Sequence, residues 1–176
     1  MALSNGNYVV LSSRESINEN ADAGAATFVN GSNGQLIGGA FGGSITSANS
    51  LVGSSRFDAI GSTFVALSNG NSVVGSSGWD AGLRGNAGAA TWGSGSTGIA
   101  GTISTSNSLI GSSTNDRVGG VITALTNGNY VVVSSRWDNA SIADAGAVTF
   151  GNGASGVAGV VSASNSLVGS SAADEV

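Results

Sequence analysis

The chain contains the same short phrases three times. Asn-Gly-Asn, followed by a pair of Val residues one position later, occurs at 5–7, 69–71 and 127–129. Two further phrases recur in the same order, Gly-Ala-x-Thr-aromatic and Asn-Ser-Leu-x-Gly-Ser-Ser. Internal repetition at a period of tens of residues is typical of propellers, solenoids and related arrays. It constrains the architecture strongly and the chemistry weakly.

The spacing of the phrases gives the length of the repeat. Successive copies of the first phrase are 64 and 58 residues apart, and the Gly of the second phrase follows the second Asn of the first phrase by 17 residues in every copy. The six extra residues of the first unit lie between Phe28 and Asn49, where we expect a surface loop or hairpin extension. We therefore expect one domain, or half of a propeller, with units at 1–61, 62–119 and 120–176.

Runs of β-branched residues around Asn-Gly predict antiparallel hairpins. The runs 121–125 and 129–134 flank such a pair, and Asn-Gly accepts the positive φ angles of a tight turn. No stretch has helical apolar spacing, and the many Gly and β-branched residues disfavour helix. We expect four short antiparallel strands in each unit. The predicted structural turn residues are Asn5, Gly6, Asn69, Gly70, Asn127 and Gly128.

Two all-β architectures fit such a unit. Four antiparallel strands, repeated, describe the blade of a β-propeller. A β-solenoid is the alternative, because an Asn-containing strand phrase occurs twice in each unit. The gaps between these phrases alternate between 22 and 36 residues, which is not an even solenoid period. The sequence therefore favours propeller-type blades.

The composition excludes several kinds of chemistry. The chain has 30 Gly and no Pro, Cys, His or Lys. Without Cys and His there is no zinc or haem site and no Ser-His-Asp triad, so we expect neither enzymatic activity nor a cofactor. A net charge of −5 with five Arg and no basic cluster disfavours nucleic-acid binding. No apolar stretch approaches the roughly 20 residues that a membrane span needs.

The order of these elements resembles the FG-GAP repeat, the blade of the integrin α-chain propeller. The matching segments, in order, are Ser108–Ser113, Asp116, Val118–Gly119, Val121–Leu125, Tyr130–Ser135 and Gly146–Phe150. The resemblance implies a propeller blade. Members of that family often carry an Asp-rich calcium loop, whereas this chain has Ser68–Asn71 and its copies there, with no carboxylate. We therefore predict no metal site in these turns.

Three blades are too few to close a propeller, which usually has four to eight. Open sheet edges invite pairing with another chain, so we expect a homodimer in which two chains associate head to tail and give six blades. The first unit contains only a stub of its first strand, and the third ends where another unit would begin. The alternative is a natural, trimmed or engineered piece of a longer array.

Candidate ligand-binding residues are few. Trp79 and Trp137 occupy equivalent loops and could stack on a sugar ring, with Arg56 and Arg136 beside aromatic residues. The alternative is that each Trp packs between neighbouring blades, where bulk is needed. Asp residues recur three positions after the Ser-Ser pairs and either line a cation site or accept backbone N–H groups in turns. These are Asp58, Asp80, Asp116, Asp138 and Asp174.

The function that we expect is a structural or adhesive repeat module for protein interaction or display. We expect it outside the cell or on the cell surface, as part of a larger bacterial protein. The alternative is a carbohydrate-binding, lectin-like module that uses the Trp-bearing loops, so that a protein or a glycan is the expected partner.

Overall fold

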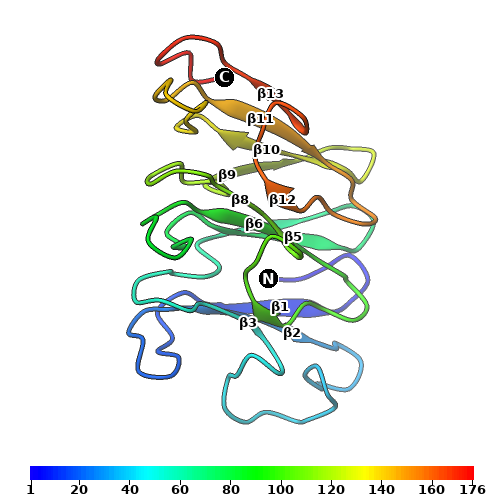
Figure 1. Ribbon diagram of the computed structural model, residues 1–176. Coiled ribbons are helices and arrows are strands. Elements are labelled where there is room, and N and C mark those ends of the chain that lie inside the picture. Colours follow the sequence, from blue (N-terminus) through cyan, green and yellow to red (C-terminus); the bar gives the residue numbers. More distant parts are fainter.

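The computed structural model describes all residues from 1 to 176 and consists of strands, turns and loops (Figure 1). The prediction of an all-β repeat protein is confirmed. The first repeat contributes β1 (Tyr8–Ser12), β2 (Ala25–Val29) and β3 (Leu51–Val52). The second contributes β4 (Thr63–Ala66), β5 (Ser72–Ser76), β6 (Ala89–Gly93), β7 (Gly101–Thr102) and β8 (Ser108–Ile110). The third contributes β9 (Val121–Ala124), β10 (Tyr130–Ser134), β11 (Ala147–Gly151), β12 (Gly159–Val160) and β13 (Ser166–Val168).

Each repeat forms an antiparallel sheet. In the second repeat β4, β5, β6 and β8 pair in that order, and β9, β10, β11 and β13 do the same in the third. The first repeat has three paired strands, and a single bridge from Ala2 to Tyr8 stands in place of the first strand.

A short parallel pairing links successive sheets. β7 leaves its own repeat and pairs with β3 of the first repeat, and β12 pairs in the same way with β8 of the second. This pairing was not predictable from the sequence, because two-residue strands carry no detectable alternation of apolar and polar residues. The second and third repeats therefore have a fifth strand each, in place of the four antiparallel strands expected in each unit.

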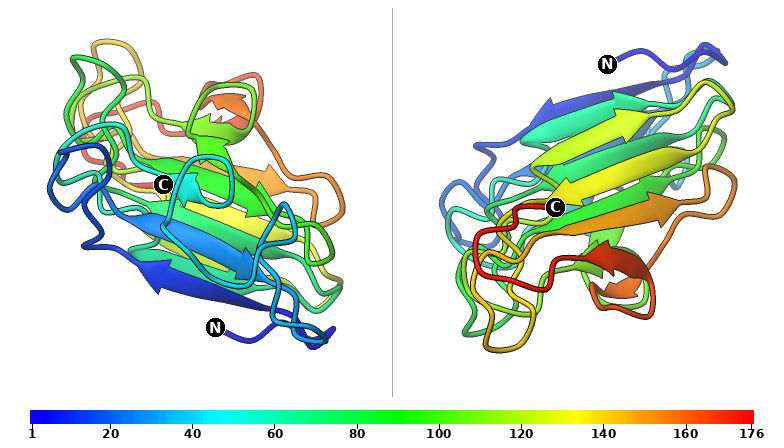
Figure 2. Two further views of the ribbon diagram at one scale, coloured as in Figure 1. Left: turned by 90° about the horizontal axis from the view of Figure 1, so that it is seen from below. Right: turned by 90° about the horizontal axis from the view of Figure 1, so that it is seen from above.

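The three sheets stack in chain order and do not close into a barrel (Figure 1). The first repeat, in blue, lies at the bottom of the view and the third, in orange and red, at the top. Views along the stack show the strands of the three sheets running in broadly the same direction, with loops at both ends of the strands (Figure 2). We call the free side of the first sheet the lower end and the free side of the third sheet the upper end.

The core lies between the sheets. Successive residues of a strand point to opposite faces, so Val73 packs toward the third repeat while Val74 packs toward the first. The lower cluster joins Val9 and Leu51 to Val74, and the upper cluster joins Val73 to Tyr130. Most buried apolar residues thus pack against a neighbouring repeat, as in other repeat proteins, while a small separate cluster lies within the first repeat and consists of Ile17, Ala23, Ala25 and Val52.

The insertion in the first repeat is an exposed loop. Gly34 and Gly43 correspond to Gly98 and Gly101, and the interval is nine residues in place of three. Phe41 at its centre is 75% exposed. The loop therefore lengthens the connection beside the lower end without adding to the cores between sheets, except for Ile37 at the edge of the lower one.

Tyr130 is the largest fully buried side chain of the upper cluster. Its hydroxyl oxygen accepts a hydrogen bond from the Val157 N–H at 3.2 Å. Burial disfavours the phenolate and raises the pKa of Tyr130 to about 12.

This shift predicts a loss of stability at alkaline pH. The unfolded chain releases the Tyr130 proton near pH 10, whereas the folded chain holds it to about pH 12. The stabilisation is therefore complete below pH 10 and falls by up to about 1.4 kcal/mol per pH unit between these values. Urea unfolding at several pH values should show this slope in the wild type. Tyr130→Phe should lack it, although the lost hydrogen bond costs about 1 kcal/mol at neutral pH. If the free energy of unfolding depended on pH in the same way in both proteins, the raised pKa of Tyr130 would be contradicted.

Candidate functional site

The Asn-Gly phrases lie at hairpin turns, but the turn differs from the one expected. In the second repeat the Gly70 N–H donates to the Leu67 carbonyl, and the Leu67 N–H donates to the Asn71 carbonyl. Only Gly70 has a positive φ, of 88°, and Asn69 does not. This is the pattern of a three-residue loop with a type I turn followed by a glycine bulge, not a two-residue Asn-Gly turn.

The two Asn side chains of each phrase bind the next repeat. Nδ2 of Asn5 and Nδ2 of Asn7 donate to the Gly95 carbonyl at 2.6 and 2.7 Å. One repeat later, Asn69 and Asn71 donate in the same way to the Gly153 carbonyl at 2.9 and 2.8 Å. We call this arrangement of two Asn amides on one glycine carbonyl the Asn clasp.

The Asn clasp also ties each repeat to itself. Oδ1 of Asn71 accepts a hydrogen bond from the Gly95 N–H at 2.9 Å, so the N–H and the carbonyl of Gly95 are both fixed by Asn side chains. A Cβ on Gly95 would lie 1.7 Å from the Gly70 carbonyl oxygen, which only glycine avoids. Sequence reasoning assigned the phrase to a turn and missed this second role. The available signal was the second Asn, present in all three copies although the turn does not need it.

The recurring Asp residues bind backbone N–H groups. Oδ2 of Asp58 accepts hydrogen bonds from the N–H groups of Ser54 and Ser55 at 2.7 and 2.8 Å. Its Oδ1 accepts from the Asp80 N–H of the next repeat at 3.0 Å. Asp116 makes the equivalent contacts, reaching the Asp138 N–H at 3.2 Å.

Asp58 and Asp116 are buried at 0% and 1% exposure. Burial raises the pKa of both carboxyls above 3.8, although the N–H donors act in the opposite direction. The structure gathers no three His, Cys, Asp or Glu side chains in a group suited to a metal ion. It also contains no helix of the length and apolarity required for crossing a membrane.

The Trp residues proposed as a sugar platform lie in the core. Trp79 is 6% exposed and Trp137 is 4% exposed, so neither indole face is open to a ligand. Nε1 of Trp137 donates to Ser112 Oγ of the preceding repeat at 3.0 Å, whereas Nε1 of Trp79 has no partner. This placement is the one that the packing alternative predicts.

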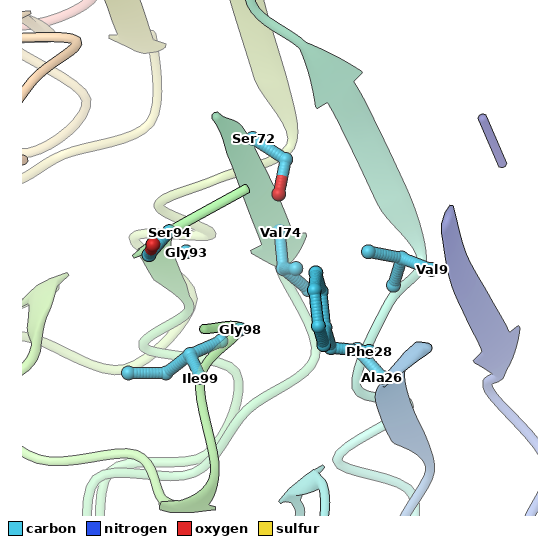
Figure 3. A pocket seen from close by; sticks show the side chains of 9 residues that line it. All are labelled: Val9, Ala26, Phe28, Ser72, Val74, Gly93, Ser94, Gly98 and Ile99. Atoms are coloured by element: carbon cyan, nitrogen blue, oxygen red, sulfur yellow. The ribbon is translucent and has the colours of Figure 1, made fainter. Parts of the chain in front are cut away.

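The two Arg candidates do not join the Trp residues in a site. The Arg56 guanidinium lies 5.3 Å from the centre of the Phe57 ring, and both residues are exposed. Arg136 is exposed beside the buried Trp137. The cavity between the first two repeats has a volume of about 10 Å³, room for about one water, and is lined by residues such as Val9, Phe28 and Ile99 (Figure 3). The recurring residues of the chain thus meet at the contacts between repeats.

The comparison with protein families corrects the resemblance drawn from the sequence. Residues 2–62, 66–120 and 124–176 each match the family described as "Repeat of unknown function (DUF5650)". No FG-GAP or integrin family matches, so that resemblance was wrong. No curated protein matches the chain. Because the three matches span nearly all 176 residues, the chain belongs to the DUF5650 repeat family.

Proposed function

We propose that the chain is a non-enzymatic structural module that stacks repeats and displays loops for interaction with other proteins. The observation that carries the proposal is the use of its recurring polar side chains. The Asn residues of the Asn clasp and the buried Asp58 and Asp116 all bind backbone groups of their own or the next repeat. These side chains are committed to holding the stack.

The location outside the cell or on the surface of a bacterium, within a larger protein, is part of the same proposal. Its support is the repetition and the low content of charged residues, 9%. The lectin-like alternative has no supporting observation, because Trp79 and Trp137 are buried. We propose that the stacked sheets act as propeller blades only when a second chain completes them.

Display requires loops that accept added sequence without loss of the fold. Gly82 and Leu83 form the tip of a small hairpin closed by hydrogen bonds between Ala81 and Arg84, and Leu83 is fully exposed. Insertion of a ten-residue Gly/Ser-flanked epitope between Gly82 and Leu83 should move the unfolding midpoint by less than about 4 °C, because lengthening a flexible loop costs little. An antibody against the epitope should bind the folded protein.

The control is the same insertion between Gly95 and Ser96, within the Asn clasp. That variant should fail to fold or should unfold at a much lower temperature. Equal damage from both insertions would contradict the proposed division between displayed loops and the contacts that hold the stack.

A further inference from the structure

The upper end of the stack exposes apolar side chains that the earlier repeats bury. Leu167 is 74% exposed, whereas its counterparts Leu109 and Leu51 are fully buried beneath the next repeat. Phe150, the counterpart of Trp92, is 55% exposed. These residues line an open hollow of about 420 Å³ together with Val131 and Val148. Seen from above, no chain segment lies in front of β9, β10 and β11 (Figure 2, right).

Polar groups at the upper end are also without the partners that their counterparts have. Nδ2 of Asn127 and Nδ2 of Asn129 make no hydrogen bond, although the equivalent pair Asn69 and Asn71 both donate to the Gly153 carbonyl. The Asn127 and Asn129 amides are therefore the donors of an Asn clasp that has no glycine carbonyl to bind.

Two further contacts between repeats stop at this end. β3 and β8 each pair in parallel with a strand of the next repeat, whereas β13 has no such partner. Oδ1 of Asp58 and Oδ1 of Asp116 each accept an N–H from the next repeat, whereas Asp174 uses only Oδ2. The upper end thus lacks every class of partner that a following repeat supplies.

The lower end presents the missing partners. The Gly31 N–H donates to Asn7 Oδ1 at 2.9 Å, as the Gly95 N–H does to Asn71, and the Gly31 carbonyl makes no hydrogen bond. Gly43 has a φ of 116°, close to the 107° of Gly101, the residue that begins β7. The Gly43 N–H makes no hydrogen bond. The backbone at Gly43 therefore resembles the start of β7, but no preceding sheet is there for it to pair with.

The other classes of contact have their counterparts at the lower end too. The Ser16 N–H, equivalent to the Asp80 N–H that binds Asp58, makes no hydrogen bond. Val10 is 43% exposed, whereas its counterparts Val74 and Val132 are buried between sheets at 1% and 0%. Each kind of group left without a partner at the upper end therefore has a possible partner at the lower end. The Asn amides match the Gly31 carbonyl, Asp174 matches the Ser16 N–H, β13 matches the backbone at Gly43, and the apolar side chains match Val10.

We propose that the upper end of one copy of this chain binds the lower end of a second copy, through the contacts that join its repeats internally. Asn127 and Asn129 of one copy close an Asn clasp on the Gly31 carbonyl of the other, and β13 pairs with the backbone at Gly43. Contact between two upper ends is disfavoured, because amide donors would meet amide donors and leave them unpaired. If two copies join at both ends, they form the six-repeat homodimer that the count of three suggests. The inference rests on the proposed stacking role and adds the partner.

The mass of the intact chain, measured by multi-angle light scattering over a range of micromolar concentrations, tests the contact. We expect the mass of two chains, unchanged as concentration rises. Longer species that grow with concentration would support the contact between ends and replace the closed dimer by an open chain. A monomer at every concentration would overturn the proposal. It would leave the proposed display role intact, because the epitope insertions test that role in a single chain.

Two single variants identify the surfaces. Leu167→Glu places a charge on the exposed upper end, and Val10→Glu places one on the lower end. Each variant alone should have the mass of one chain, with an unchanged circular dichroism spectrum. The control Leu83→Glu, at a fully exposed loop tip, should keep the mass of two chains.

Mixing the variants decides the direction of the contact. Leu167→Glu keeps a normal lower end and Val10→Glu keeps a normal upper end, so an equimolar mixture should form a complex of one chain of each. Association of Val10→Glu with itself would place the contact between two upper ends and overturn the proposal. Failure of the mixture to associate would do the same.

Discussion

Replacement of Gly95 by alanine should lower the free energy of unfolding by more than about 4 kcal/mol, an exceptional value for a single methyl group. The added Cβ would lie 1.7 Å from the Gly70 carbonyl oxygen. The backbone cannot yield easily, because its N–H is bound by Asn71 and its carbonyl by Asn5 and Asn7 of the preceding repeat. Urea unfolding followed by Trp fluorescence measures the loss.

A matched control is Gly85→Ala. The nearest atom to a Cβ at Gly85 is Asp80 Oδ1 at 3.8 Å, an ordinary contact, and the residue does not have a positive φ. This variant should stay within about 0.5 kcal/mol of the wild type. If Gly95→Ala proved equally harmless, Gly95 would not lie against the Gly70 carbonyl, and the geometry of the Asn clasp would be wrong as well.

The features that were predictable from sequence are those encoded by neighbouring residues. The hairpin at Asn127-Gly128 follows from a turn signal between two β-branched runs, and the structure places β9 and β10 on either side of it. The repeat length follows from fixed spacings. The Asp residues were expected either at a cation or in turns, and the turn role follows from local chemistry, since an Asp side chain reaches N–H groups three and four residues before it.

The features that were missed depend on contacts between repeats. β7 and β12 are two residues long and are defined only by the sheet that they join, so no periodicity marks them. The Asn clasp joins Asn5 to Gly95, 90 positions away. A pattern repeated in three units shows that a residue has a fixed role without showing whether its partner is in the same unit or the next.

The mistaken FG-GAP resemblance has a related cause. The matched segments, such as Gly146–Phe150, are short runs of small and β-branched residues around turns. Any repeat of four antiparallel strands with tight turns places such runs in a similar order. The feature with chemical content was the calcium loop, and Ser68–Asn71 lacks its carboxylates. In this chain the same turn holds the Asn clasp, which binds the next repeat.

Replacement of Trp137 by alanine should cost about 3–5 kcal/mol, the range for removing a large buried aromatic side chain. The indole is 4% exposed, packs in the upper cluster with residues such as Leu109, and donates to Ser112 Oγ across the boundary between repeats. The loss combines a cavity with a hydrogen bond lost across the boundary, so both repeats should be destabilised together. Thermal unfolding should show one transition at a lower temperature.

Arg136→Ala is the control, because its side chain is exposed next to the same indole. It should change the free energy of unfolding by less than about 0.5 kcal/mol. Trp137→Phe should fall between the two, since it keeps much of the packing and loses the hydrogen bond to Ser112. If Trp137→Ala were as stable as the wild type, the indole would be free of the core and open to a ligand. Equal losses in all three variants would instead show that the loop, and not the indole, supports the boundary between the repeats.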